Sequence, residues 1–172
     1  MDPFIIRDAT ADDIKPIHAL IAAHQSEGHL LPRELSDVER RVRQFVVCDA
    51  GGRLCGCAEL TRLSPVLAEV RSLVVAPEFR RSGVAAALIE ELRRRATAAG
   101  FETLCALAHD ARLFVHRNFS IVPHAWLPEK IAKDCVGCSL FRHCGQHAML
   151  LPLKHVGRQR AAHIHHRQVA VA

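Results

Sequence analysis

One continuous stretch in the middle of the chain constrains the fold more than any other. It runs LAEVRSLVVAPEFRRSGVAAALIEELRRRATAA from Leu67 to Ala99. Its first part is rich in β-branched apolar residues and stops before Pro77, which cannot donate to a sheet ladder. From Val84 onward, apolar residues recur at helical spacing opposite a charged face, and Gly100 is expected to end the helix. The stretch therefore predicts a strand, a tight basic loop and an amphipathic helix.

The loop between these elements has the composition of a phosphate-binding turn. It reads Arg80-Arg81-Ser82-Gly83-Val84-Ala85, with a glycine directly before the expected helix. Glycine lets the backbone approach a ligand closely, and the first amides of a helix have no intrahelical partner. A helix terminus contributes only about 0.3–1 kcal/mol toward a charge, so several amides and an arginine would have to converge. The alternative is an ordinary turn with surface arginines, because short glycine motifs have many false positives.

These residues resemble a known family. Arg80-x-x-Gly83-x-Ala85, after a strand that ends Leu73-Val74-Val75, is similar to the acetyl-CoA motif of the GNAT N-acetyltransferases, Arg/Gln-x-x-Gly-x-Gly/Ala. The resemblance implies an α/β (α+β) fold with a mixed, mostly antiparallel sheet flanked by helices, and acetyl-CoA as cosubstrate. It also implies that backbone groups of Leu73, Val74 and Val75 pair with the pantetheine arm. The amides from Arg80 to Ala85 would hold the diphosphate.

The rest of the chain supplies further strands and helices. Apolar runs predict strands over residues 4–7, 46–48, 54–63, 103–108 and 148–153, and helical spacing begins near residues 14, 35 and 111. Gly51 and Gly52 suit the tight turn of a hairpin. Asn118 replaces the glycine that usually follows the last of these helices in the family, and asparagine tolerates the left-handed conformation that this turn requires.

Length and charge are consistent with a single domain. With 172 residues and 49% hydrophobic content, the chain can bury one core, which we assign to residues 1–154. Residues 155–172 are predicted to be a flexible, basic, histidine-rich tail, with adventitious metal or nucleic-acid contact as the alternative. Of the net charge of +5, three charges belong to this acid-free tail, which leaves +2 for the body. The charge therefore predicts no nucleic-acid partner.

Targeting signals and cysteine usage favour a cytoplasmic protein. No stretch approaches the roughly 18 apolar residues of a membrane span, and the chain begins without a signal-peptide pattern. Cys48, Cys55, Cys57 and Cys105 lie in apolar runs, where free cysteine acts as a small buried hydrophobe. We expect no membrane partner; a homodimer through sheet edges stays open.

A second resemblance is narrower and extends over most of residues 4–153. It is to the acetyltransferase domain of the N-acetylglutamate synthases. The segments that carry it are Gly28-x-Leu30-Leu31-Pro32-Arg33, Gly56-Cys57-Ala58, Ala68-Glu69-Val70-Arg71-Ser72-Leu73, Leu127-Pro128-Glu129-Lys130, Asp134-Cys135-x-x-Cys138 and Cys144 ahead of Ala148-Met149. This resemblance implies a short, stand-alone enzyme that lacks the amino-acid-kinase domain and acetylates the α-amino group of L-glutamate for arginine biosynthesis.

The reaction needs a base, because only a neutral amine attacks a thioester. An amino pKa of about 8 to 10.4 means that deprotonation at pH 7 costs about 1.4–4.6 kcal/mol. Glu69 matches the acidic residue that has this role in the synthases; the alternatives are a water relay or a structural carboxylate paired with Arg71 or another cation. A backbone amide near Val74 is the candidate donor to the oxyanion.

Proton donation to the leaving thiolate has no assigned residue. Many members of the fold use a tyrosine on the helix after the fifth strand, but this chain has no tyrosine and carries Phe114 there. Ser72, His109 and His116 are open alternatives, and water could suffice because thiolate is a good leaving group.

A glutamate substrate carries two carboxylates, so its site should contain cations. The resemblance assigns glutamate binding to Arg33; the alternative is an exposed arginine that caps the next helix. Ser72 and Lys130 complete the predicted acceptor site, and Lys133 is a further source of a second cation. Arg71 is the weaker choice, since we expect it on the sheet face opposite Glu69.

The cysteines near the C-terminus allow a metal interpretation. Cys135, Cys138, Cys144 and His147 offer four ligands of the kinds that zinc prefers. Their spacing is not that of a standard zinc finger, so we predict free thiols and no metal.

The sequence therefore predicts an acetyl-CoA-dependent N-acetyltransferase that acts on L-glutamate. One alternative is the same chemistry on another amino acid, a peptide or a small amine. The other is a non-catalytic acetyl-CoA-binding sensor, which would bind the cosubstrate without turnover.

Overall fold

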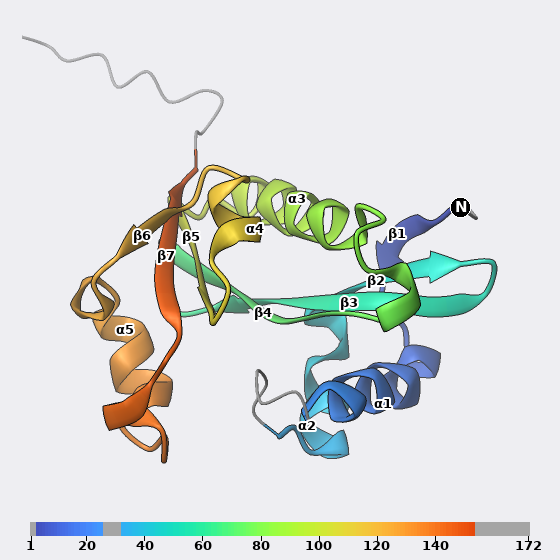
Figure 1. The fold of residues 1–172 in the computed structure, drawn as a ribbon, viewed down its shortest axis with the longest axis horizontal. Helices are drawn as coiled ribbons and strands as arrows, with labels where there is room; N and C mark the ends of the chain where they lie inside the picture. The colour runs from blue at the N-terminus through green and yellow to red at the C-terminus, as the bar shows by residue number, and fades with distance from the viewer. Residues whose placement is uncertain (1–2, 26–31, 154–172) are drawn as a thin grey trace, which may run out of the picture.

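The computed structural model describes residues 3–25 and 32–153, and a seven-stranded sheet forms its centre (Figure 1). The strand order is β1-β2-β3-β4-β5-β7-β6. The strands are β1 (Ile5–Asp8), β2 (Phe45–Ala50), β3 (Arg53–Arg62), β4 (Leu67–Val75), β5 (Thr103–Ala108), β6 (Ser120–Val122) and β7 (His147–Pro152). β4 and β5 run parallel and the other neighbouring pairs run antiparallel, so the predicted mixed sheet is confirmed.

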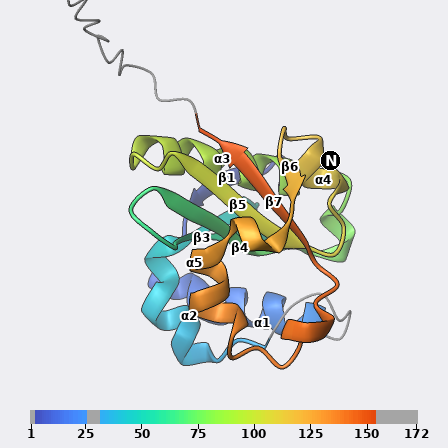
Figure 2. The same cartoon turned by 90° about the vertical axis from the view of Figure 1, so that its left-hand side faces the viewer.

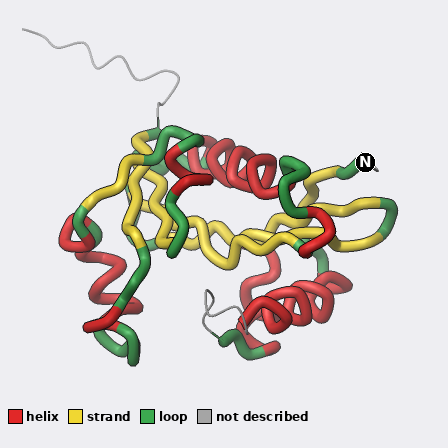
Figure 3. Tube along the Cα trace, in the orientation of Figure 1, coloured by secondary structure: helices red, strands yellow, loops and turns green. Residues whose placement is uncertain are grey.

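Helices cover both faces of this sheet (Figures 1 and 2). One side carries α1 (Ile14–Gln25), α2 (Leu35–Arg41) and α5 (Pro128–Lys130), which continues into a π-helical turn at Ile131–Cys135. The other side carries α3 (Val84–Ala98) and α4 (Arg112–Val115). Figure 3 shows the strands as one band with helices above and below it. Short 3₁₀ turns lie at Ala11–Asp13, Val42–Gln44, Pro77–Phe79, His124–Trp126 and Phe141–His143.

The core has a layer on each side of the sheet. The apolar stripe of α3 is buried as its spacing predicted; its members are Val84, Leu88, Ile89, Leu92 and Ala96. On the opposite face, Ile17 and Ile21 of α1 pack with Phe45, Val47 and Val74 of the sheet. Each fully buried aliphatic side chain contributes about 1.5–3 kcal/mol, so these two layers fix both helices on the sheet.

Several turns adopt the conformations that the sequence predicted. Gly51 and Gly52 have φ angles of 62° and 85° in the β2–β3 hairpin. Gly100 follows the end of α3 with φ 83°. Gly83, the N-cap of this helix, has φ 89°, which the sequence did not predict. Asn118 also lies in the left-handed region, at φ 68°, so the turn after α4 is kept without glycine.

A bulge in β4 opens the sheet beside β5. Glu59 of β3 pairs with Arg71, whereas Cys57 pairs with Val74, so β4 has one residue more than β3 over this interval. The extra residue falls at Ser72, whose φ is 47°. The pairs between β4 and β5 run from Leu67–Thr103 to Val70–Ala106, while β4 itself continues to Val75. Beyond Val70, one edge of β4 is therefore not paired with β5.

The sequence did not predict one strand, the helical segment from Pro128 to Cys135 or the position of the last strand in the sheet. β6 was not predicted, and β7 lies between β5 and β6 rather than simply closing the sheet. β6 has three residues, which is too short for an alternating pattern to be recognised. Residues 28–31 of the predicted acceptor motif and the predicted tail, 155–172, lie outside the described residues. No helix in the described part is long and apolar enough to cross a membrane.

Candidate active site

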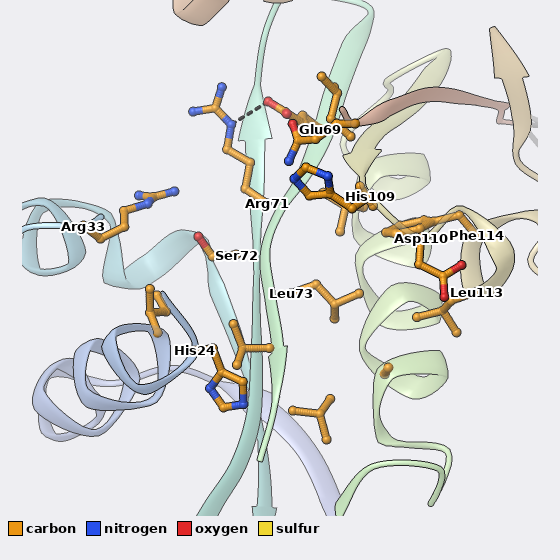
Figure 4. A pocket seen from close by; sticks show the side chains of 18 of the residues that line it. His24, Arg33, Glu69, Arg71, Ser72, Leu73, His109, Asp110, Leu113 and Phe114 are labelled. Atoms are coloured by element: carbon orange, nitrogen blue, oxygen red, sulfur yellow. Dashed lines mark hydrogen bonds and ion pairs between the residues drawn. The ribbon is translucent and has the colours of Figure 1, made fainter. Parts of the chain in front are cut away.

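A cavity of about 830 Å³ lies between the two helical layers, along the bulged part of β4 (Figure 4). This volume is typical of a small-molecule site. Most of the predicted site residues line it; they are Arg33, Glu69, Ser72, Leu73, Val74, Val75, Arg80, Ala85 and Lys130. Arg81, Ser82, Gly83 and Val84 are not among its lining residues. Segments far apart in the sequence, from α1 to α5, thus meet around one strand.

One half of the cavity is built mainly from backbone and apolar side chains. It contains the β4 edge from Leu73 to Val75 and the start of α3 at Ala85. Asp110, Leu113 and Phe114 lie on the same side (Figure 4), and Arg80 also lines the cavity. Gly83 lies beside it, and an added Cβ there would meet nothing within 4 Å, so the approach to the helix terminus is open. The side chain of Val84 is buried in the core, so only its backbone amide is available to a ligand.

The other half contains a charged network around Glu69. The side chain of Glu69 is 3% exposed, and its Oε2 accepts from Arg71 Nε at 2.5 Å. Lys130 Nζ lies 2.7 Å from Glu69 Oε1 and 3.1 Å from Asp134 Oδ2. Arg71 also bonds Asp134. Two carboxylates and two cations thus compensate one another, which offsets the free-energy cost of burying these charges.

The expectation for Arg71 was wrong. Residues two apart on a strand lie on the same face, and Arg71 contacts Glu69 directly (Figure 4). Arg71 therefore lines the cavity together with Glu69. The pairing of Glu69 with Arg71, which was the structural alternative, is present in the same cavity that holds the other predicted acceptor residues.

A second charged network, which the sequence did not reveal, lies around Glu59 of β3. Arg33 Nη1 lies 2.8 Å from Asp37 Oδ2, and Arg33 also bonds Glu59. Arg41 Nη1 lies 3.2 Å from Glu59 Oε1, which also accepts from Thr61 Oγ1 at 2.8 Å. The only available signal was an acid inside the apolar run of β3, since a buried carboxylate needs a cation.

Arg33 is not an exposed cap of α2. Its side chain is 14% exposed, and Glu34, not Arg33, occupies the N-cap position. Burial acts to raise the pKa of Asp37, but the charge and hydrogen bond of Arg33 outweigh it and hold that pKa below its usual value. Asp37 is therefore ionised at neutral pH, and it helps to fix the Arg33 guanidinium.

The predicted second cation, Lys133, has a different position. Its Nζ donates to the carbonyl of Arg62 at 2.8 Å, and it does not line the main cavity. Burial, followed by the nearby charges of Arg71 and Arg41, lowers the pKa of Lys133. The region is thus already rich in positive charge.

The open proton-donor alternatives now differ in position. Ser72 and His109 line the cavity, whereas His116 does not (Figure 4). Phe114 packs edge-on against Phe119, with ring centroids 5.2 Å apart, and offers no hydroxyl. His24 also lines the cavity; its Nδ1 lies 2.7 Å from the carbonyl of Leu20, and its buried Nε2 has no partner among the described residues.

The cysteines divide into a buried and a more exposed group. Cys48, Cys55, Cys57 and Cys105 are buried and free, as predicted, and burial raises the pKa of Cys57 to about 12. Cys135, Cys138 and Cys144 are free and partly or fully exposed. Over residues 3–25 and 32–153, no three His, Cys, Asp or Glu side chains are arranged to hold a metal ion.

The site thus combines a bulged strand whose pairing with its parallel neighbour stops at Val70, a helix terminus beside it and a charged cavity. The chain belongs to the acetyltransferase (GNAT) family, whose model matches residues 12–119. The resemblance seen in the loop before α3 is thereby confirmed.

Similar proteins agree with this membership. The N-acetylglutamate synthase of Neisseria gonorrhoeae, solved with coenzyme A and N-acetyl-glutamate, has a TM-score of 0.79 and 28% identity; the match covers 90% of this chain and 36% of that one. The amino-acid acetyltransferase of Pseudomonas putida KT2440 is 32% identical over 118 residues, 67% of this chain and 27% of the relative. An uncharacterized N-acetyltransferase of Chlorobaculum tepidum is 28% identical over 86% of this chain and 96% of its own length.

These coverages separate two kinds of relative. The chain spans about a quarter of the amino-acid acetyltransferase it matches, but nearly all of the Chlorobaculum protein. Membership of the family makes the chain an acetyltransferase.

Proposed function

We propose that the protein transfers the acetyl group of acetyl-CoA to the α-amino group of L-glutamate in the cytoplasm, as an N-acetylglutamate synthase does at the start of arginine biosynthesis. The observation that carries the proposal is that Arg33, Glu69 and the free edge of β4 line one cavity. The structural similarity to the Neisseria synthase supports the same acceptor.

The residues present fit coenzyme A, with which the Neisseria synthase was solved. The edge of β4 from Leu73 to Val75 is not paired with β5, so backbone groups there are available to the amides of a pantetheine arm. The carbonyl of Val75 accepts a long hydrogen bond of 3.5 Å from Arg80 Nε. The first amides of the 15-residue helix α3, with Arg80 and Arg81 beside them, suit a diphosphate. Bound acetyl-CoA supplies the activated acetyl thioester.

The acceptor half fits a molecule with carboxylates. A guanidinium has five N–H donors, and Asp37 and Glu59 each engage a different terminal nitrogen of Arg33. Arg33 thus has donors left for a substrate carboxylate, while Arg71 and Lys130 line the same cavity on β4 and α5. We assign Arg33 to one carboxylate of glutamate, and Lys130 and Ser72 to the rest of the acceptor.

In the proposed reaction, Glu69 takes a proton from the amine of the acceptor, directly or through water. Each carboxylate oxygen has two lone pairs, so Glu69 can accept a further hydrogen bond while Arg71 and Lys130 hold it in place. The amine nitrogen then bonds to the acetyl carbon and the carbon–sulfur bond breaks, which releases coenzyme A as a thiol after protonation. A β4 amide near Val74 is our candidate donor to the oxyanion.

The test is release of free coenzyme A by the purified protein with acetyl-CoA and L-glutamate, L-glutamine, L-aspartate or no acceptor. We expect selective turnover of L-glutamate, and Arg33→Ala should raise the KM for glutamate at least tenfold because an arginine–carboxylate pair is lost. Arg40→Ala is the matched control, since Arg40 contacts Asp37 but does not line the cavity.

Two outcomes would contradict the proposal in different ways. Faster turnover of another amine would keep the acetyltransferase and exclude glutamate as its substrate. Binding of coenzyme A without turnover on a broad amine panel would indicate the sensor.

A further inference from the structure

Glu59 is an unusual residue for the middle of a sheet. It lies on β3 and is fully buried, with a relative exposure of 0%. Burying an ionised carboxylate is costly unless cations and hydrogen-bond donors compensate it. Here Arg33 engages Oε2, while Arg41 Nη1 and Thr61 Oγ1 engage Oε1 at 3.2 and 2.8 Å. Both oxygens are thus occupied.

The two arginines reach Glu59 from outside the sheet. Arg33 precedes α2 and Arg41 is its last residue, so Glu59 binds both ends of this short helix segment. Both arginines line the cavity, whereas Glu59 does not. A substrate in the cavity would therefore contact the arginines, and Glu59 would act on it only through them.

Glu59 also adjoins the network around Glu69. Glu59 is the cross-strand partner of Arg71, and Thr61 is the partner of Glu69. Directly paired side chains on one face of a sheet lie about 4.5–5.5 Å apart at Cβ. The position of Arg33 relative to Arg71 and Glu69 is thus set by a rigid sheet contact, although Arg33 itself lies in a loop.

We propose that Glu59 is a positioning residue that fixes Arg33, supported by Arg41, so that the cavity selects acceptors with a carboxylate. This inference rests on the proposed function. Without Glu59, the Arg33 guanidinium would lose its buried anchor and, among the described residues, keep only Asp37, whose side chain is 26% exposed. Binding of the acceptor should weaken, and the chemical step and acetyl-CoA binding should not.

The test is the initial rate of Glu59→Gln over a grid of acetyl-CoA and L-glutamate concentrations, or of whichever acidic acceptor the panel selects. We expect the acceptor KM to rise at least tenfold, with kcat and the acetyl-CoA KM within about twofold of the unmodified protein. Asp49→Asn is the matched control: it removes another carboxylate–arginine pair of the same sheet, with Arg7, and neither residue lines the cavity. It should leave both KM values unchanged.

A double-mutant cycle separates positioning from a purely structural role. If Glu59 acts through Arg33, Glu59→Gln should add less than twofold to the acceptor KM in an Arg33→Ala background. Additive effects on KM would overturn the proposal. So would a fall in kcat with an unchanged acceptor KM.

Further variants distinguish misfolding of Glu59→Gln from failure of the proposed role of Arg33 in carboxylate binding. If Glu59→Gln does not fold, Glu59→Asp retains the charge on a shorter arm, and we expect an intermediate acceptor KM; an unchanged KM would overturn the proposal. If Arg33→Ala alone leaves the acceptor KM unchanged, the carboxylate assignment in the proposed function fails instead.

Discussion

The two halves of the cavity are formed by different kinds of chemical group. The half beside α3 is formed by the edge of β4 from Leu73 to Val75 and the start of α3 at Ala85, with Asp110, Leu113 and Phe114 on the same side (Figure 4). The acceptor half uses charged side chains from α2 and the loop before it, β3, β4 and the α5 region. The first half is formed mostly by backbone and apolar groups, whereas the second is held together by ion pairs between distant segments.

This difference explains how the halves can change separately. Backbone contacts tolerate many side chains, so the α3 half can bind one invariant ligand in many related proteins. In the acceptor half each buried carboxylate is paired with cations, so removal of one partner leaves another buried charge uncompensated. We therefore expect substitutions in the two halves to affect different kinetic constants.

The largest effect is expected from Glu69→Gln, which alters the acceptor half at its chemical centre. A glutamine cannot take the proton of the amine, so kcat should fall about 100-fold or more. Steady-state kinetics measure this fall. Asp134→Asn is the control, because Asp134 shares Arg71 and Lys130 with Glu69; its kcat should fall less than tenfold. If the kcat of Glu69→Gln is within threefold of that of the unmodified protein, Glu69 is not the base.

A tenfold effect on the other half is expected from Gly83→Val. Gly83 and Gly100 have nearly equal positive φ angles, 89° and 83°, at opposite ends of α3. A side chain in this conformation costs about 1–2 kcal/mol at either position, so both valine variants should melt at lower temperature. Only Gly83→Val should raise the acetyl-CoA KM, by about tenfold, because only this glycine lies beside the proposed diphosphate site. Equal effects of the two variants on KM would contradict the assignment.

The two halves also differ in how well the sequence predicts them. The loop before α3, the apolar stripe of that helix, the glycine after its end and the left-handed turn at Asn118 are local features that the sequence predicts. Pairing within the acceptor half depends on sequence separations as large as the 63 residues between Arg71 and Asp134. No local pattern encodes such contacts, so Glu59, which is 26 residues from Arg33, was not predicted as its partner.

Two further errors concern the strands: the sheet face assigned to Arg71 and the short strand β6. Arg71 was placed on the wrong face although alternation puts it beside Glu69, and β6 was missed because three residues give no pattern. The insertion of β7 between β5 and β6 is a long-range choice of partner that the strand itself does not encode.

The smallest effect is expected far from both halves, at Asp13. The hydrogen bond from Arg7 lowers the pKa of Asp13 below 3.8 although burial opposes it. The stabilisation is therefore complete above the unfolded pKa and is lost as pH falls through the folded value. Asp13→Asn should lower the free energy of unfolding by about 1–2 kcal/mol at pH 7, and the difference should shrink below pH 3.8. Denaturant unfolding at several pH values measures this difference in the free energy of unfolding. A difference that grows as the pH falls would contradict the prediction. Both KM values should stay unchanged.

The most direct test of the division is a crystal structure of the protein with coenzyme A and N-acetyl-L-glutamate. The account predicts the diphosphate against the amides between Arg80 and Ala85, the pantetheine arm along the unpaired edge of β4, and a product carboxylate on Arg33 with Glu59 still bound behind it. A carboxylate bound elsewhere, or a diphosphate away from the start of α3, would contradict it.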